Sequence, residues 1–169
     1  MAPPRHDHVN VVTADMDRAI AFYTGLLGLA VVMDRRLDGP WFQTLIGQPA
    51  ASARCVILDA PGGGCRIELL HFPAGMAQPQ QPPTIAGLRH VAIRVDDLDV
   101  RLDLLRRDFA QEVAVIEVPH DIVKGGKRMC YLRDPDGTIV ELCEYGLDRP
   151  EFHGCPTSRS ALSKATSPA

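Results

Sequence analysis

The stretch that decides the fold runs from Arg133 to Tyr145 and reads Arg-Asp-Pro-Asp-Gly-Thr-Ile-Val-Glu-Leu-Cys-Glu-Tyr. Its first half predicts a turn, because proline presets φ for the first central position and glycine accepts the positive φ that closes the turn. A strand follows, in which alternation puts Val140 and Leu142 on one face and Glu141 on the other. A carboxylate among apolar neighbours is costly to bury unpaired. We therefore expect water or a cation, a metal ion included, at Glu141.

The same design occurs earlier in the chain. Residues 61–72 read Pro-Gly-Gly-Gly-Cys-Arg-Ile-Glu-Leu-Leu-His-Phe, so a Pro/Gly turn again leads into a strand with a central carboxylate, Glu68. Two histidines also stand in equivalent places, since His8 precedes Asp15 by the same interval as His90 precedes Asp97. Each aspartate is a candidate helix N-cap. The repeat predicts a fold built from two copies of one supersecondary unit.

Periodicity assigns the elements of each copy. Apolar residues at helical spacing follow each capping aspartate, and β-branched runs predict the strands. The order is βαβββ twice, which is an α+β fold class. We expect a first module over 1–72, a Pro-rich linker over 73–87, a second module over 88–146 and a flexible Ser- and Pro-rich tail over 147–169. The expected strands are 8–13, 29–37, 53–58 and 65–72, then 88–95, 113–118, 128–133 and 138–145, with a loop over 38–49.

Composition narrows the class of protein. A chain of 169 residues with 46% hydrophobic content is long enough for a compact domain with a real core. A net charge of −3 gives no indication of the basic surface that binds nucleic acid. We expect no membrane span and no signal peptide, hence a cytoplasmic protein, because no apolar run approaches about 20 residues and residues 1–5 lack an apolar core. Five cysteines without a Cys-x-x-Cys pair argue against a disulfide framework or a zinc knuckle.

Strand alternation turns four potential ligands toward one inner face of the sheet. A lone strand histidine or glutamate is more often a hydrogen-bonded or solvated residue, but equivalent placement in two modules favours a metal site. Two imidazoles and two carboxylates suit Zn²⁺, Ni²⁺, Co²⁺, Mn²⁺ or Fe²⁺. The other histidines are weaker candidates, although His6 competes with His8 and His120 lies in a loop near the site. The expected ligands are His8, Glu68, His90 and Glu141.

These features resemble the vicinal oxygen chelate superfamily, the group of glyoxalase I, methylmalonyl-CoA epimerase, extradiol dioxygenases and bleomycin and fosfomycin resistance proteins. The resemblance rests on the two modules, on Ala21-Phe-Tyr-Thr-Gly-Leu-Leu-Gly28 and on the Asp-Pro-Asp-Gly turn before Glu141, and it covers residues 7–145. Residues 134–141 and 123–126 look most like the small glyoxalase branch. The resemblance implies a cupped, barrel-like sheet of eight strands with helices outside, a divalent metal inside, and a homodimer. Whether each site lies within one chain or is shared between two stays open at this point.

The ligand number selects the chemistry. Four ligands leave an octahedral ion two positions, which fit the paired oxygens of an α-hydroxycarbonyl or an enediolate, whereas an oxygenase generally uses two histidines and one carboxylate. We expect a metal-dependent lyase or isomerase of the glyoxalase type that acts on a small substrate with vicinal oxygens. Glu141 or Glu68 is the expected base, with Glu141 favoured by its more apolar strand face. The alternatives are an extradiol-type dioxygenase and a non-catalytic drug-binding resistance protein, the latter weakened by an aromatic content of 5%.

Further residues are candidates for substrate binding. Asn10 and Arg94 share the inner face with the ligands. Lys124 and Lys127 flank Gly125-Gly126, where a solvated loop is the plain interpretation and a clamp on a substrate carboxylate the sharper one. One departure weakens the epimerase interpretation. The strand before the second ligand reads Arg-Cys-Val-Ile-Leu over 54–58 and lacks the separate catalytic carboxylate of that family.

Overall fold

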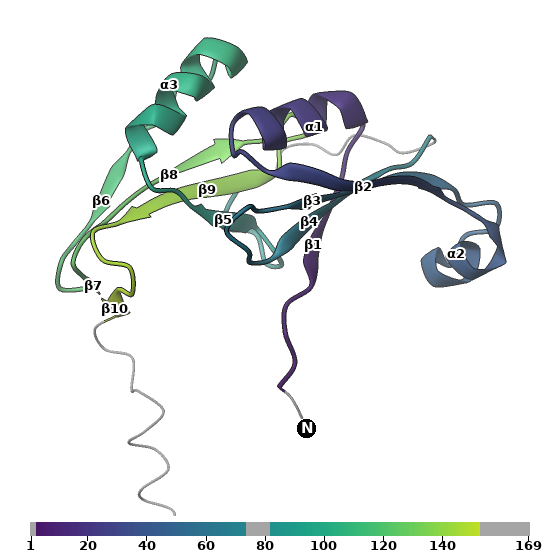
Figure 1. The fold of residues 1–169 in the computed structure, drawn as a ribbon, viewed down its shortest axis with the longest axis horizontal. Coiled ribbons are helices and arrows are strands. Elements are labelled where there is room, and N and C mark those ends of the chain that lie inside the picture. Colours follow the sequence, from purple (N-terminus) through teal and green to yellow (C-terminus); the bar gives the residue numbers. More distant parts are fainter. Residues whose placement is uncertain (1–2, 74–81, 153–169) are drawn as a thin grey trace, which may run out of the picture.

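The computed structural model describes residues 3–73 and 82–152 and confirms the predicted α+β fold of two repeated modules (Figure 1). Each module opens on a strand and a helix and closes on antiparallel strands. The first contains β1 His8–Val12, α1 Met16–Gly25, β2 Ala30–Leu37, α2 Gly39–Ile46, β3 Ala53–Asp59 and β4 Arg66–His71. The second contains β5 His90–Arg94, α3 Leu98–Phe109, β6 Ile116–Val118, β7 Val123–Lys124, β8 Lys127–Arg133, β9 Ile139–Tyr145 and β10 Glu151–Phe152.

The two modules form four-stranded sheets of the same topology. Their orders are β1-β4-β3-β2 and β5-β9-β8-β6, and β1 pairs in parallel with β4 as β5 does with β9. The eight predicted strands are thus divided between two sheets. A separate two-stranded ribbon joins β7 to β10.

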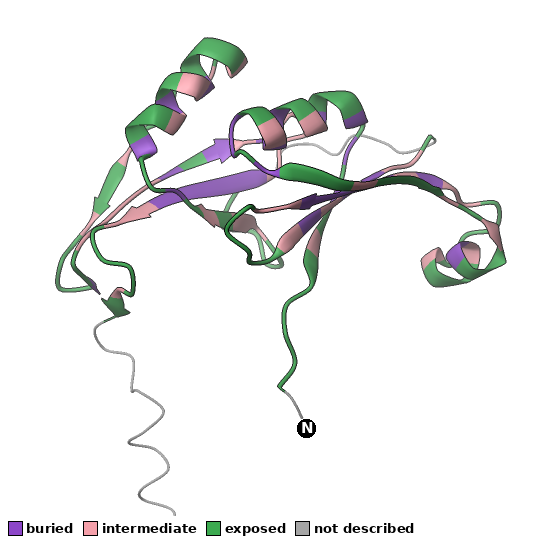
Figure 2. Cartoon of the chain, in the orientation of Figure 1, coloured by how far each residue is buried: buried purple, intermediate pink, exposed green. Residues whose placement is uncertain are grey.

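One hydrophobic core joins the modules. α1 and α3 lie on the same side of the sheets (Figure 1), and buried residues of both helices and both sheets form a single cluster. Phe22 of α1 meets Phe109 of α3 edge to face, with ring centroids 5.2 Å apart. Buried residues concentrate on β3, β4, β8 and β9 and on one face of α1 and α3, whereas β2 has none (Figure 2). The two modules therefore pack against each other through the sheet faces that α1 and α3 cover.

The Asp-Pro-Asp-Gly turn fastens the second module to the first. Tyr23 of α1 donates its hydroxyl to Asp134 at 2.9 Å, and Thr13 donates to Asp136 at 2.5 Å. The backbone N–H groups of Asp136 and Thr138 donate to the other Asp134 oxygen. Burial raises the pKa of Asp134, while these hydrogen bonds oppose the rise. The turn found by its sequence is thus also a contact between modules.

Two segments differ from the sequence expectation. The predicted loop over 38–49 contains α2, which has Pro40 in its first turn and Gly47 as a left-handed C-cap. Phe42 anchors this helix on the sheet, in a buried cluster with Cys55 and residues of β4. The predicted tail includes β10, whereas residues 153–169 and the linker residues 74–81 lie outside the described part.

Within 3–73 and 82–152, no helix has the length and apolar character needed to cross a membrane.

Candidate metal centre

Each module holds one His–Glu pair on the two strands that run parallel in its sheet, β1 and β4 in the first and β5 and β9 in the second. His8 Nε2 lies 3.6 Å from Glu68 Oε2 on β4, and His90 Nε2 lies 3.5 Å from Glu141 Oε2 on β9. Adjacent donors around an ion with metal–ligand bonds of about 2.1 Å lie roughly 3.0–3.4 Å apart. Each pair is thus close to the arrangement of two neighbouring ligands on one ion.

The two pairs do not meet within one chain. Over residues 3–73 and 82–152, no group of three or more His, Cys, Asp or Glu side chains could hold a metal ion. The expected cup that gathers all four ligands is therefore not formed inside the chain. The physical reason is strand alternation: Leu69 and Leu142 point into the core that joins the modules, so Glu68 and Glu141 point away from it. The chain thus carries one His–Glu pair on each of two separate sheets.

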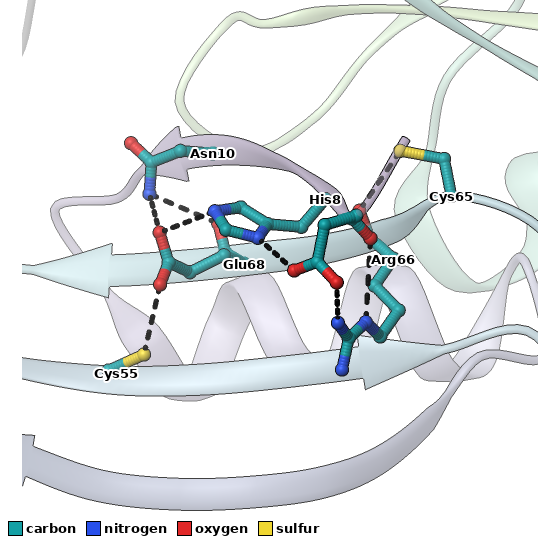
Figure 3. A network of polar contacts seen from close by, with 7 residues as sticks. His8, Asn10, Cys55, Cys65, Arg66 and Glu68 are labelled. Carbon is teal, nitrogen blue, oxygen red and sulfur yellow. Dashed lines mark hydrogen bonds and ion pairs between the residues drawn. The ribbon is translucent and has the colours of Figure 1, made fainter. Parts of the chain in front are cut away.

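The first pair is held by a polar network (Figure 3). Asn10 donates to Glu68 Oε2 at 3.0 Å, and the thiol of Cys55 on β3 donates to Oε1 at 3.5 Å. His8 Nδ1 lies 2.8 Å from Asp7 Oδ2, and Asp7 also pairs with Arg66. The hydrogen bonds with His8 and Arg66 lower the pKa of Asp7. With Nδ1 engaged by a carboxylate, Nε2 of His8 is the nitrogen turned toward Glu68, as is usual for metal-binding histidines.

Asp7 is a site residue that sequence reasoning missed. It directly precedes β1, and no spacing singled it out. The available signal was chemical, because a metal-binding histidine commonly has a carboxylate on its second nitrogen. Adjacency to His8 makes Asp7 a candidate for that role.

The second pair is held by a cation. Glu141 is 5% exposed, and Lys127 on β8 donates to its Oε1 at 2.6 Å. Burial opposes the charge on Lys127, but the hydrogen bond and the charge of Glu141 outweigh it and raise the pKa of Lys127. The sequence left water or a cation as the partner of Glu141, and in the structure the partner is this ammonium group.

The other candidate substrate residues lie at different distances from the pairs. Arg94 donates to the backbone oxygen of Asp148 at 2.6 Å and lies 5.6 Å from the centroid of the Tyr145 ring. The ammonium of Lys127 lies 5.4 Å from the same centroid. Lys124 instead pairs with Glu151 at 3.1 Å on the exposed β7–β10 ribbon. The structure therefore brings Asn10 and Lys127 to the pairs, places Arg94 and Lys127 on the two strands that flank β9 near Tyr145, and leaves Lys124 outside.

Comparison with known proteins assigns the family. The family described as Glyoxalase/Bleomycin resistance protein/Dioxygenase superfamily matches residues 5–142. The chain belongs to this superfamily. Its relatives include a 2-epi-5-epi-valiolone epimerase of Actinomyces sp, 28% identical over 141 residues that cover 80% of this chain and 76% of the relative. Human mitochondrial methylmalonyl-CoA epimerase is 28% identical over 148 residues, covering 82% and 72% of the two chains.

Solved structures agree with this assignment. A glyoxalase family protein from Bacillus cereus superposes with a TM-score of 0.71 at 25% identity, over 86% of this chain and 96% of that one. The trypanothione-dependent glyoxalase I of Leishmania major shares the fold, with a TM-score of 0.56 at 22% identity over 96% and 93% of the chains. The superfamily thus includes epimerases and glyoxalases, enzymes of the isomerase and lyase type.

The pair-bearing faces of this superfamily member differ between the modules. In the first, Phe42 of α2 and its neighbours cover part of the face that carries Glu68. In the second, Tyr131 lies opposite Glu141 in the β8–β9 register and is 42% exposed, and Ile116 on the same face is 58% exposed. The second module therefore presents an open face with apolar side chains beside the His90–Glu141 pair.

Proposed function

We propose that this chain is a metal-dependent isomerase or lyase of the glyoxalase type that acts on a small substrate with vicinal oxygens. The observation that carries the proposal is the repeated His–Glu geometry, with Nε2 and Oε2 3.6 Å apart in one module and 3.5 Å in the other. A set of two imidazoles and two carboxylates fits Zn²⁺, Ni²⁺, Co²⁺, Mn²⁺ or Fe²⁺. The epimerases among the relatives support this class of chemistry.

The complete site forms, in this proposal, across a homodimer. His8 and Glu68 of one protomer meet the partner's His90 and the partner's Glu141. A twofold axis generates the reciprocal site from the remaining pairs, so a dimer holds two equal sites. The open face at Tyr131 and Ile116 supports this arrangement, because a second copy would cover apolar side chains that one chain leaves in solvent.

The two carboxylates differ in their capacity to accept a proton. A bound divalent ion would polarise the substrate oxygens and so acidify the adjacent C–H bond. Glu141 Oε1 already accepts a hydrogen bond from the Lys127 ammonium, whereas Glu68 Oε1 accepts one only from a thiol, a weak donor. The positive charge of Lys127 stays near Glu141 even when an ion replaces its ammonium on Oε1, so Glu68 is the better proton acceptor. It takes the proton from carbon and returns it to the neighbouring carbon, and Glu141, which the sequence favoured as the base, acts mainly as a ligand.

Two substitutions test this assignment after metal content has been measured. We expect about one ion per protomer in protein expressed with excess metal. Glu68→Gln keeps an oxygen for coordination but loses the base, so turnover should fall by about 10²-fold or more with much of the metal retained. Glu141→Gln should mainly weaken metal binding, and its turnover should recover at high metal concentration. The screen should use hemithioacetals and hydroxyacyl thioesters.

The outcomes separate the parts of the proposal. Well under one ion per protomer in the wild-type protein would overturn the metal site. Full turnover in Glu68→Gln at saturating metal would return the role of base to Glu141.

A further inference from the structure

Lys127 forms an ion pair with Glu141, one of the carboxylates proposed to bind the metal ion. Its ammonium is 2.6 Å from Glu141 Oε1, and the side chains of Lys127 and Glu141 are only 14% and 6% exposed. The other Glu141 oxygen faces His90 at 3.5 Å. In the chain as it stands, a lysine thus neutralises one of the carboxylates proposed to bind the ion.

Among the described residues, no lysine or arginine pairs with the carboxylate of Glu68 in the first module. Glu68 accepts hydrogen bonds from Cys55 and Asn10, both neutral, and lies near His8. Arg66 on the same strand is engaged by Asp7 instead. The two half-sites are alike in their His–Glu geometry and differ in this one charge.

The charge decides the effect of Lys127 on metal binding. A neutral hydrogen-bond donor behind a ligand usually strengthens binding, and its loss weakens metal affinity about 10- to 100-fold. Lys127 is not neutral: two carboxylates already balance a divalent ion, and a further positive charge a few ångströms away repels it in a poorly solvated site. Lys127 also stabilises the metal-free state, because it satisfies a buried carboxylate. Both effects act against the ion.

Building on the proposed metal site, we propose that Lys127 and the divalent ion compete for Glu141. Lys127 is the counter-ion of Glu141 in the metal-free protein, and metal binding displaces its ammonium from Oε1. The displaced group remains beside the Tyr145 ring, which Arg94 also approaches. From there its charge would stabilise negative charge that develops on substrate oxygens.

Metal titration of the full-length protein tests the competition. Lys127→Met should bind Mn²⁺ more tightly than the wild-type protein by about tenfold or more, a magnitude common for coupled binding events. Lys127→Arg keeps the charge and should stay near the wild-type affinity. Lys124→Met removes an exposed lysine of the same loop region and should leave the affinity unchanged. Turnover of Lys127→Met at saturating Mn²⁺ should nevertheless fall, a combination that a purely structural lysine would not produce.

A double-mutant cycle guards against misfolding of the single variant. Lys127→Met combined with Glu141→Gln buries no unpaired charge. In this background the lysine substitution should raise Mn²⁺ affinity clearly less than in the wild-type background, because only the repulsion between Lys127 and the ion is left to remove. Unchanged or weaker Mn²⁺ binding by folded Lys127→Met would overturn the competition and leave the metal site standing. If Lys127→Met binds Mn²⁺ and the wild-type protein does not, the competition is supported and metal dependence of the wild-type protein is overturned. If neither protein binds Mn²⁺, the competition and the metal site are both overturned.

Discussion

The smallest feature that shapes the proposed site is the side chain behind His8. Asp7 engages Nδ1 at 2.8 Å, which fixes the ring so that Nε2 faces Glu68. A carboxylate in this position orients a metal-binding imidazole and raises its strength as a ligand. The His8 half-site is thus organised by two residues that are adjacent in sequence.

Asp7→Ala should therefore weaken metal binding by about 10- to 100-fold, the range typical for loss of a residue that orients a ligand. Calorimetric titration with Mn²⁺ or Zn²⁺ measures this. Asp38→Ala is the matched control, because Asp38 is also an exposed aspartate paired with an arginine, Arg36, but contacts no proposed ligand. Wild-type affinity in Asp7→Ala would show that His8 needs no such support.

Cys55 shows how a residue type takes its role from burial. Burial, followed by the charge of Glu68, raises the pKa of Cys55 to about 12. At neutral pH the side chain is therefore a thiol that can donate to Glu68. It stands in the strand where the sequence offered no spare acid, and it leaves Glu68 as the basic group.

At the scale of elements, the contact between α1 and the Asp134 turn joins the two modules. The Tyr23 hydroxyl donates to a carboxylate that is only 4% exposed. A hydrogen bond to a buried charged group contributes about 1.5–3 kcal/mol. This contact therefore accounts for a considerable part of the stability of a marginally stable domain.

Tyr23→Phe should lower the free energy of unfolding by about 1.5–3 kcal/mol at neutral pH, measured by urea denaturation. Burial raises the pKa of Asp134 in the folded state, and the Tyr23 hydrogen bond favours its ionised form. The difference between wild type and Tyr23→Phe should therefore shrink as the pH falls through this raised pKa and Asp134 becomes protonated. For Asp134 itself the linkage has the matching sign, since its raised pKa favours folding at low pH and loses this contribution as the pH rises.

Tyr131→Phe is the control for this series. Tyr131 lies on the face of the sheet away from the core, and the substitution removes a hydroxyl that makes no hydrogen bond among the described residues, so the unfolding free energy should stay close to the wild-type value. A Tyr23→Phe effect that did not change with pH would mean that Asp134 titrates outside the range measured.

At the scale of the whole molecule, the division into half-sites predicts complementation between defective chains. One variant carries His8→Ala with Glu68→Gln, and the other carries His90→Ala with Glu141→Gln. Neither should bind metal alone. A mixed dimer would combine the intact first module of one chain with the intact second module of the other, so random exchange should restore about a quarter of the wild-type sites.

Metal content and turnover after mixing through a denatured state measure this restoration. Analytical ultracentrifugation at micromolar concentrations should show a dimer before and after mixing. No recovery from a mixture that does form mixed dimers would place each site within a single chain. A monomer in the wild-type protein would remove the basis of the shared site.

Local sequence determined the repeated modules and the faces of their strands. Proline and glycine turns, capping aspartates and a side-chain period of two act over a few residues, so they assigned Glu68, Glu141, His8 and His90 to one face each, as the structure confirms. α2 escaped this reasoning because a helix of this length is stabilised mainly by the packing of Phe42 on a distant strand. The sequence also contained the signals Pro40 and Gly47, but they are weak without that contact.

Only the tertiary structure decided what each of these faces meets. The alternation of side chains along a strand predicts which face of the sheet a residue occupies. It does not predict which other element packs against that face. The core that joins the modules therefore separates the two His–Glu pairs, and the β8–β9 register brings the Lys127 ammonium to Glu141. Both outcomes arise from contacts between residues far apart in sequence, whose free energy depends on the packing of the whole domain.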